Sequence, residues 1–226
     1  MSAVSDDRYR KRTGPSGGRA RSKTPKKMVV YRFNPRYEPI RGSKTERKFV
    51  DVSSLETPGT GATTFSTPVL LNGIAEGASA TTRIGRKIVM KSLLLRYIWS
   101  LGATSIRGAA CRVKIVYDRQ ANTAAPAVTD ILLANNVLSP NNISNNERFV
   151  TLVDFFTDPV SIENNFQVCG EVYRKINLPT RFDDGTGATI ADVTTGSVYM
   201  MVAQTGGVAT ESPVFTYRSR IRYEDI

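Results

Sequence analysis

The chain has 226 residues, 40% of them hydrophobic, which is enough for one domain with a substantial core. It contains no histidine, so triads, metal sites and proton relays that depend on histidine are excluded. The formal net charge of +11 is unevenly placed: residues 1–48 hold 15 Lys and Arg against 4 Asp and Glu, while residues 49–226 hold 16 of each. This asymmetry predicts a basic tail for nucleic acid or another acidic surface, attached to a neutral domain.

The first segment, residues 1–28, is rich in Gly, Pro and Ser and nearly lacks large apolar residues. Such a segment cannot bury enough surface to offset its chain entropy, so we expect it to be disordered. Residues 29–45 add aromatic and aliphatic anchors around Pro35 and Pro39, which predicts an extended connector. We therefore assign residues 1–45 to a basic arm and connector, and residues 46–226 to a folded domain.

The arm is predicted to bind nucleic acid without reading its sequence, because Lys and Arg neutralise phosphates and release counterions. Tyr9, Tyr31 and Phe33 lie among the charges, where they can stack on exposed bases. The same clusters fit a nuclear localisation signal read by import receptors. A tail used for targeting alone, or for solubility alone, is the alternative. The candidate binding residues are Arg8, Arg10, Lys11, Arg12, Arg19, Arg21, Lys23, Lys26 and Lys27.

From about residue 46 the sequence is typical of β-strands, with segments rich in Val, Ile, Thr, Tyr and Phe bounded by Gly, Pro, Asn or Asp. One short helix is predicted within Pro126–Asn135. Long polar connections favour an all-β fold, an eight-stranded jelly-roll β-sandwich, over a meander of tight hairpins. The eight strands are expected near residues 46–54, 65–72, 86–101, 109–118, 148–156, 170–178, 196–205 and 213–223.

Two of these strands have informative patterns. In 109–118 the alternation predicts that Ala109, Cys111, Val113, Ile115 and Tyr117 face the core, and that the charged residues between them face out. Those outward residues are Arg112, Lys114 and Asp118. The segment 86–101 is apolar on both faces, which predicts a central strand covered on both sides.

The last strand carries Arg218, Arg220 and Arg222 at a spacing of two residues, which places all three on one face. Three interpretations stay open for this face. It can contact packaged nucleic acid, pair with acidic residues of a neighbouring subunit, or be an ordinary solvated strand face.

Other features give no specific chemistry. The two cysteines, Cys111 and Cys169, are expected to be buried thiols, although a disulfide between them stays open. A calcium site near Asp183 and Asp184 is conceivable, but turn chemistry explains this pair better. No nucleophile–base set, cofactor, metal site or apolar membrane span is found, so we expect neither an enzyme nor a secreted or membrane protein.

Three motifs in order resemble capsid proteins of circular, Rep-encoding single-stranded DNA viruses, the circovirus and geminivirus type. The stretch Arg83–Arg96 resembles their "RIG-basic-hydrophobic-KS" strand, and Leu71–Ile74 resembles its usual lead-in. Val116–Gln120 with the later Asp130–Leu132 resembles "YDRQ…P…DIL". Asn146–Asp154 resembles the "RF-x-VL-x-D" strand of this family.

This resemblance implies that residues 46–226 form one jelly-roll shell domain, and that the protein is a virion component assembled in the host nucleus. It implies self-assembly, with about 60 copies in the simplest icosahedral shell. It also implies an inward arm that packages the genome, with single-stranded DNA favoured over RNA. Two rivals stay open: a monomeric nucleic-acid-binding β-module, and a β-sandwich enzyme or lectin with a polar pocket.

Overall fold

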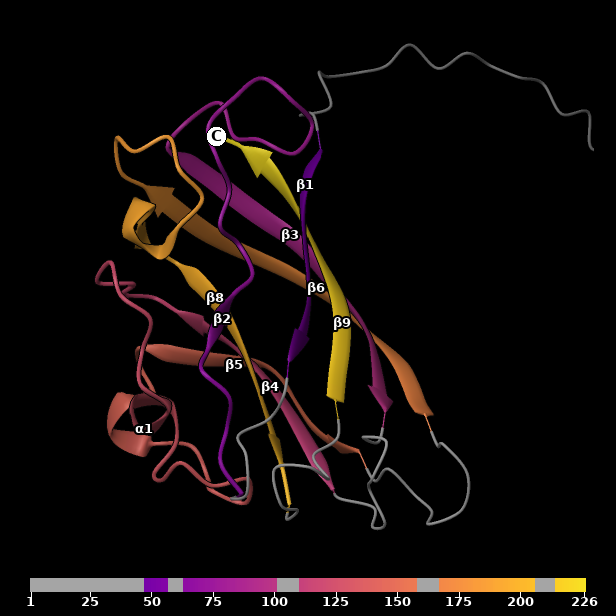
Figure 1. Ribbon diagram of the computed structural model, residues 1–226. Helices are drawn as coiled ribbons and strands as arrows, with labels where there is room; N and C mark the ends of the chain where they lie inside the picture. Colours follow the sequence, from indigo (N-terminus) through magenta and orange to yellow (C-terminus); the bar gives the residue numbers. More distant parts are fainter. Residues whose placement is uncertain (1–46, 57–62, 101–109, 158–166, 206–213) are drawn as a thin grey trace, which may run out of the picture. The chain divides into compact units, whose positions relative to one another are not determined.

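The computed structural model describes residues 47–56, 63–100, 110–157, 167–205 and 214–226, all within the unit Ser43–Ile226. Each of the eight expected strands has a counterpart, β2 is much shorter than expected, and the three-residue β7 is additional (Figure 1). No helix in these ranges is long and apolar enough to cross a membrane. The elements are β1 (Lys48–Glu56), β2 (Val69–Leu70), β3 (Lys87–Ser100), β4 (Cys111–Asp118), α1 (Val128–Ile131), a 3-10 turn (Ile143–Asn145), β5 (Phe149–Thr157), β6 (Gln167–Phe182), a second 3-10 turn (Ile190–Asp192), β7 (Val193–Thr195), β8 (Ser197–Gln204) and β9 (Val214–Asp225).

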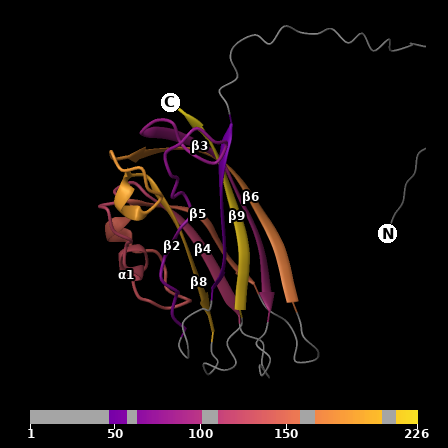
Figure 2. The same ribbon diagram turned by 45° about the horizontal axis from the view of Figure 1, so that its top comes forward.

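The strands form two antiparallel sheets. Sheet A has the order β1-β9-β3-β6-β7, and sheet B has the order β2-β8-β4-β5. Strands that follow one another along the chain, such as β1 and β2 or β8 and β9, lie in different sheets, so the chain wraps across the sandwich repeatedly. The turned view in Figure 2 shows the two sheets as two layers. This arrangement confirms the predicted all-β jelly-roll sandwich.

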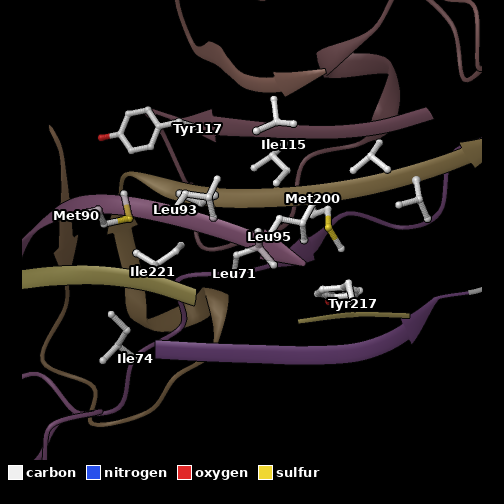
Figure 3. Close-up of a cluster of buried hydrophobic side chains, with 14 of the residues drawn as sticks. Leu71, Ile74, Met90, Leu93, Leu95, Ile115, Tyr117, Met200, Tyr217 and Ile221 are labelled. Carbon is white, nitrogen blue, oxygen red and sulfur yellow. The ribbon is translucent and has the colours of Figure 1, made fainter. Parts of the chain in front are cut away.

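The main core lies between the sheets, where side chains of both layers point toward one another (Figure 3). Met90, Leu93 and Leu95 of β3 contribute from sheet A, and Ile115 and Met200 contribute from sheet B. The alternation predicted for β4 is confirmed, since Cys111, Val113, Ile115 and Tyr117 are all buried in this core; Ala109 lies outside the described residues.

A second apolar cluster lies on the other face of sheet B, where the excursion between β4 and β5 packs over the strands. Ile131 and Leu132 of this excursion pack near Val116 of β4. The expectation that the outward residues of β4 are exposed to solvent is therefore wrong. Arg112, Lys114 and Asp118 face away from the main core but are 6%, 0% and 0% exposed, because the excursion covers them.

Sheet A has no comparable cover among the described residues. β3 is central, since it pairs with β9 on one side and β6 on the other. The expectation that both faces of β3 are covered is wrong, because Arg96 and Ile98 on its outward face are exposed. Cys169, opposite Ile98 on β6, is exposed as well, so the buried-thiol expectation holds only for Cys111. The two thiols are not bonded to each other.

Buried Asn72, from the predicted lead-in motif, joins the two sheets. Its amide nitrogen donates to the hydroxyl of Thr180 on β6 at 3.1 Å and to the carbonyl of Gly196 at 2.8 Å. Its amide oxygen accepts from the backbone N–H of Val198 on β8 at 2.8 Å. Gly196 has a φ of +82°, a region that favours glycine. This network fixes the corner at which the chain passes between the sheets.

Candidate nucleic-acid and assembly surfaces

The nine candidate residues of the arm, from Arg8 to Lys27, lie outside the described residues. Their role in nucleic-acid binding stays a prediction. The same holds for the boundary between arm and shell domain.

The alternation predicted for the last strand is present in β9. Phe215, Tyr217, Ser219, Ile221 and Tyr223 are buried under the sheet, and the arginines between them lie on the outward face of sheet A. Arg218 and Arg222 are exposed, whereas Arg220 is partly covered. The three arginines therefore share one face, as their spacing requires.

Arg220 is neutralised within its own chain. Its Nε and Nη2 donate to the two carboxylate oxygens of Asp51 on the neighbouring strand β1, each at 2.6 Å. This hydrogen-bonded guanidinium holds the pKa of Asp51 below its usual value. The guanidinium also lies 4.5 Å from the ring centroid of Phe49. An acidic partner thus exists for Arg220, and it belongs to the same chain.

Arg218 and Arg222 form no ion pair with any described residue. Arg218 lies between Ser53 on β1 and Arg96 on β3, and Arg96 is itself paired with Glu171 at 2.6 Å. Like charges placed directly opposite each other on neighbouring strands are unfavourable unless an anion lies between them. These two arginines consequently leave excess positive charge on the outward face of sheet A.

Apolar groups lie beside this charge. Leu94 on β3 is opposite Tyr173 on β6, and the Tyr173 ring is 55% exposed. Ile98, further along β3, is 40% exposed. Tyr173 shares the outward face of sheet A with Arg218 and Arg222, with β3 lying between β6 and β9. A face that offers both an exposed ring and unpaired cations can stack on bases and neutralise phosphates.

A second basic spot lies at the other end of the same sheet. Lys87 on β3 is directly opposite Arg181 on β6, and both are exposed. With Arg86 they line an open depression of about 630 Å³ that also includes Asp183. Arg86 forms an ion pair with Asp184, so part of its charge is already balanced.

The covered charges on β4 have a structural role. Asp154 of β5 accepts from Arg112 and, at 2.7 Å, from Lys114. Burial opposes ionisation of Asp154, but these two cations overcome it and lower the pKa of Asp154. Asp118 is similarly paired with Arg148 at 2.8 Å. Arg112, Lys114 and Asp118 are buried beneath the excursion, whereas the side chains of Asp154 and Arg148 stay partly exposed.

Arg83, the first residue of the RIG motif, is also structural. It is fully buried, and its guanidinium donates to the carbonyls of Ile74, Gly85 and Gly185. It lies 4.4 Å from the ring centroid of Phe182. The motif therefore clamps two loops together. Its composition gave no sign that this arginine is buried.

The acidic pair near residue 183 behaves as a turn. The Asp183 carboxylate accepts from the backbone N–H of Gly185 at 2.8 Å, as in an Asx-turn. Within the described ranges, no cluster of three or more His, Cys, Asp or Glu side chains is arranged to hold a metal ion. Trp99 is fully buried and packs on Phe215 with ring centroids 4.5 Å apart.

Jelly-roll sandwiches occur in viral capsid proteins, lectins and cupins. The comparisons with known proteins select the first of these classes. The satellite tobacco necrosis virus coat protein family matches residues 21–226. The chain belongs to this family. It is therefore a viral coat protein, a structural component of the virion.

A curated relative agrees with this assignment. The chain is 30% identical over 145 residues to the coat protein of Maize white line mosaic satellite virus, covering 63% of this chain. The match spans 62% of the length of that relative. The expectation of a viral coat protein is thus confirmed, but the matching family is that of a satellite virus, and the comparisons do not point to circular single-stranded DNA viruses.

Two solved structures show only weak likeness to this chain. A virus-like particle of the giant freshwater prawn Macrobrachium rosenbergii nodavirus aligns at 12% identity and a TM-score of 0.24, covering 91% of this chain and 99% of that chain. The VP1 pentamer of human polyomavirus 6 aligns at 10% identity and a TM-score of 0.21, covering 82% and 96%.

Proposed function

We propose that this coat protein assembles into a small icosahedral shell, with about 60 copies in the simplest case, and packages the viral genome inside it. The observation that carries the proposal is the position of the charge. The whole net charge of +11 falls within residues 1–48 of a chain that belongs to a coat protein family. Many such arms in one shell offset the repulsion between packed phosphates.

The outward face of sheet A is the second contact to the genome. Arg218 and Arg222 carry unpaired charge there, and Tyr173 offers an exposed ring. Arg220 contributes less, because Asp51 already neutralises it. The arm supplies most of the affinity, and the sheet gives the nucleic acid a surface to lie on.

The packaged genome is RNA in this proposal. Membership in a satellite virus coat protein family favours RNA over the single-stranded DNA implied by the sequence resemblance. Neither the arm nor the arginines on β9 form a motif that reads bases. The phosphates of RNA and of single-stranded DNA can therefore both pair with these positive charges. Single-stranded DNA is therefore the alternative outcome of the test.

The test compares full-length protein with a variant that lacks residues 1–28. Binding to single-stranded RNA and DNA of one sequence is measured over a range of salt concentrations. The truncated protein should keep its fold and bind both more weakly, with a salt slope that is smaller by about 0.7 for every phosphate that the arm neutralises. Unchanged affinity and slope would show that the arm does not bind the genome. Nuclease typing of particles from infected tissue distinguishes RNA from DNA.

A nuclear import role for the same basic clusters is a separate proposal. It depends on Arg8–Arg12 and Lys26–Lys27, and not on the shell domain. Fluorescent full-length protein in host cells should then enter the nucleus, and a variant with the basic residues of these clusters changed to glutamine should not. Equal distributions of the two would contradict import by this arm.

A further inference from the structure

The excursion between β4 and β5 contains a run of sixteen residues without a single charge. This uncharged segment, residues 131–146, reads ILLANNVLSPNNISNN and lies between Asp130 and Glu147. Longer runs without charge occur at residues 57–75 and 193–210, but the second of these includes the fully buried strand β8, whereas residues 131–146 carry several strongly exposed side chains. Depletion of charge is the compositional mark of the buried centre of a protein–protein interface.

Large apolar side chains point outward from the same segment. Leu133, Leu138 and Ile143 are 60%, 74% and 82% exposed. These three residues fall within eleven positions, and they make up a large part of the strongly exposed hydrophobic side chains in the described ranges. Their neighbours Ile131 and Val137 are buried in the second cluster, so apolar residues are present on both sides of the segment. The outer set has no partner within the described part of the chain.

The segment is also held in place from beneath. Arg112 Nη1 donates to the carbonyls of Val137 and Ser139 at 2.7 and 2.8 Å. The Leu133 N–H donates to the Pro140 carbonyl at 3.1 Å, which closes the turn. Asn145 Nδ2 donates to the Asp130 carbonyl at 2.9 Å. A backbone fixed in this way loses little entropy when its outward side chains bind a partner.

We propose that the uncharged segment is a self-contact of the shell, where copies of the same segment from neighbouring subunits meet about a symmetry axis. The proposal rests on assembly as stated under Proposed function. The absence of charge from the segment favours copies of the same segment as its binding partner. Around a symmetry axis each residue approaches its own copies, so any charge repels itself, whereas Leu, Ile and Asn do not. The outward face of sheet A, with Arg218 and Arg222, is unsuited to such a contact.

The first test measures proximity inside assembled particles of the full-length protein. Cys169→Ser removes the exposed native thiol, and Leu138→Cys or Ile143→Cys is added one at a time. The matched control is Ile84→Cys, a similarly exposed apolar residue (64%) in the loop that precedes β3. Figure 1 shows that β3 begins at the end of the sandwich away from α1. A short thiol-specific bifunctional crosslinker should link subunits through position 138 or 143 and not through position 84.

The second test introduces charge. Leu138→Asp with Ile143→Asp should abolish particles while leaving a folded, soluble subunit that still binds nucleic acid, and Ile84→Asp should leave assembly intact. Circular dichroism and thermal melting check the fold of each variant. Particles that form normally with both aspartates, or that crosslink no better at 138 and 143 than at 84, would overturn this inference alone. Failure of the unmodified protein to form particles would overturn the proposed function as well.

Discussion

Arg112 and Asp154 form a bidentate ion pair between β4 and β5, with Nε–Oδ1 and Nη2–Oδ2 distances of 2.7 and 2.8 Å. The same guanidinium holds the carbonyls of Val137 and Ser139 in the excursion. One side chain thus connects the covered face of sheet B to the loop that covers it.

Arg112→Met should therefore be strongly destabilising. It removes the stronger partner of a half-buried carboxylate and leaves two backbone carbonyls without a donor. We expect a loss of about 3–5 kcal/mol in the free energy of unfolding, measured with denaturant on unassembled subunits. A loss below about 1 kcal/mol would mean that apolar packing and the other hydrogen bonds of the excursion, such as that from the Val137 N–H to the Thr63 carbonyl, hold it without Arg112.

Lys114→Met should behave differently, although Lys114 contacts the same carboxylate. Burial lowers the pKa of Lys114 despite its bond to Asp154, so the charged amine is disfavoured in the folded state. Arg112 remains to pair with Asp154. We expect a change within about 1 kcal/mol at neutral pH. The unmodified protein should gain stability relative to this variant as the pH rises through the folded-state pKa of Lys114 toward 10.5.

The ionisation of Asp154 should affect how the free energy of unfolding falls at acid pH. Its folded-state pKa lies below the usual value of 3.8, so its ion pairs stabilise the fold above that pH. This contribution is lost as the pH falls below 3.8 through the folded-state pKa. Asp154→Asn should be less stable at pH 7 and show a shallower acid-induced loss. Parallel curves for the two proteins would show that other carboxylates govern acid unfolding.

Two glycines allow a matched comparison. A Cβ added to Gly196 would lie 2.2 Å from the Pro179 carbonyl oxygen, and the φ of +82° adds backbone strain. A Cβ added to Gly85 would meet nothing closer than 3.9 Å. Gly196→Ala should cost about 2 kcal/mol or more, and Gly85→Ala should be within about 0.5 kcal/mol of the unmodified protein. Similar thermal midpoints for both variants would contradict this description of the corner.

The three arginines of β9 differ in whether an acidic side chain pairs with them, so their contributions to RNA binding can be measured separately. Changing Arg218 and Arg222 to glutamine should lower the affinity for single-stranded RNA and reduce the salt slope by about 0.7 for each phosphate that these arginines neutralise. The double change Arg220→Gln with Asp51→Asn keeps the net charge and serves as the control, and it should leave the slope unchanged. Equal slopes for all three proteins would mean that this face does not touch the genome.

The strands could be predicted well from the sequence because β-branched and aromatic runs bounded by turn residues are local signals. The inward residues of β4 could be predicted too, since alternation alone determines them. The burial of Arg112, Lys114 and Asp118 could not, because the cover comes from a loop whose docking depends on tertiary contacts. The exposure of Cys169 was missed for the same kind of reason. Nothing local shows that the outward face of sheet A stays open.

The candidate sites divide in the same way. The common face of Arg218, Arg220 and Arg222 followed from a period of two, whereas the pairing of Arg220 with Asp51 needed the register between β1 and β9. Arg83 was seen as part of a motif, but its clamp on Gly185 joins residues about a hundred positions apart. Such long-range pairs leave no trace in a single sequence.

Formation of a shell around nucleic acid is tested most directly by sedimentation of the purified full-length protein with negative-stain imaging. The 260 to 280 nm absorbance ratio is recorded for each fraction. We predict uniform, closed particles whose absorbance ratio shows packaged nucleic acid. A discrete monomer at all protein and salt concentrations would contradict assembly and favour the monomeric nucleic-acid-binding module.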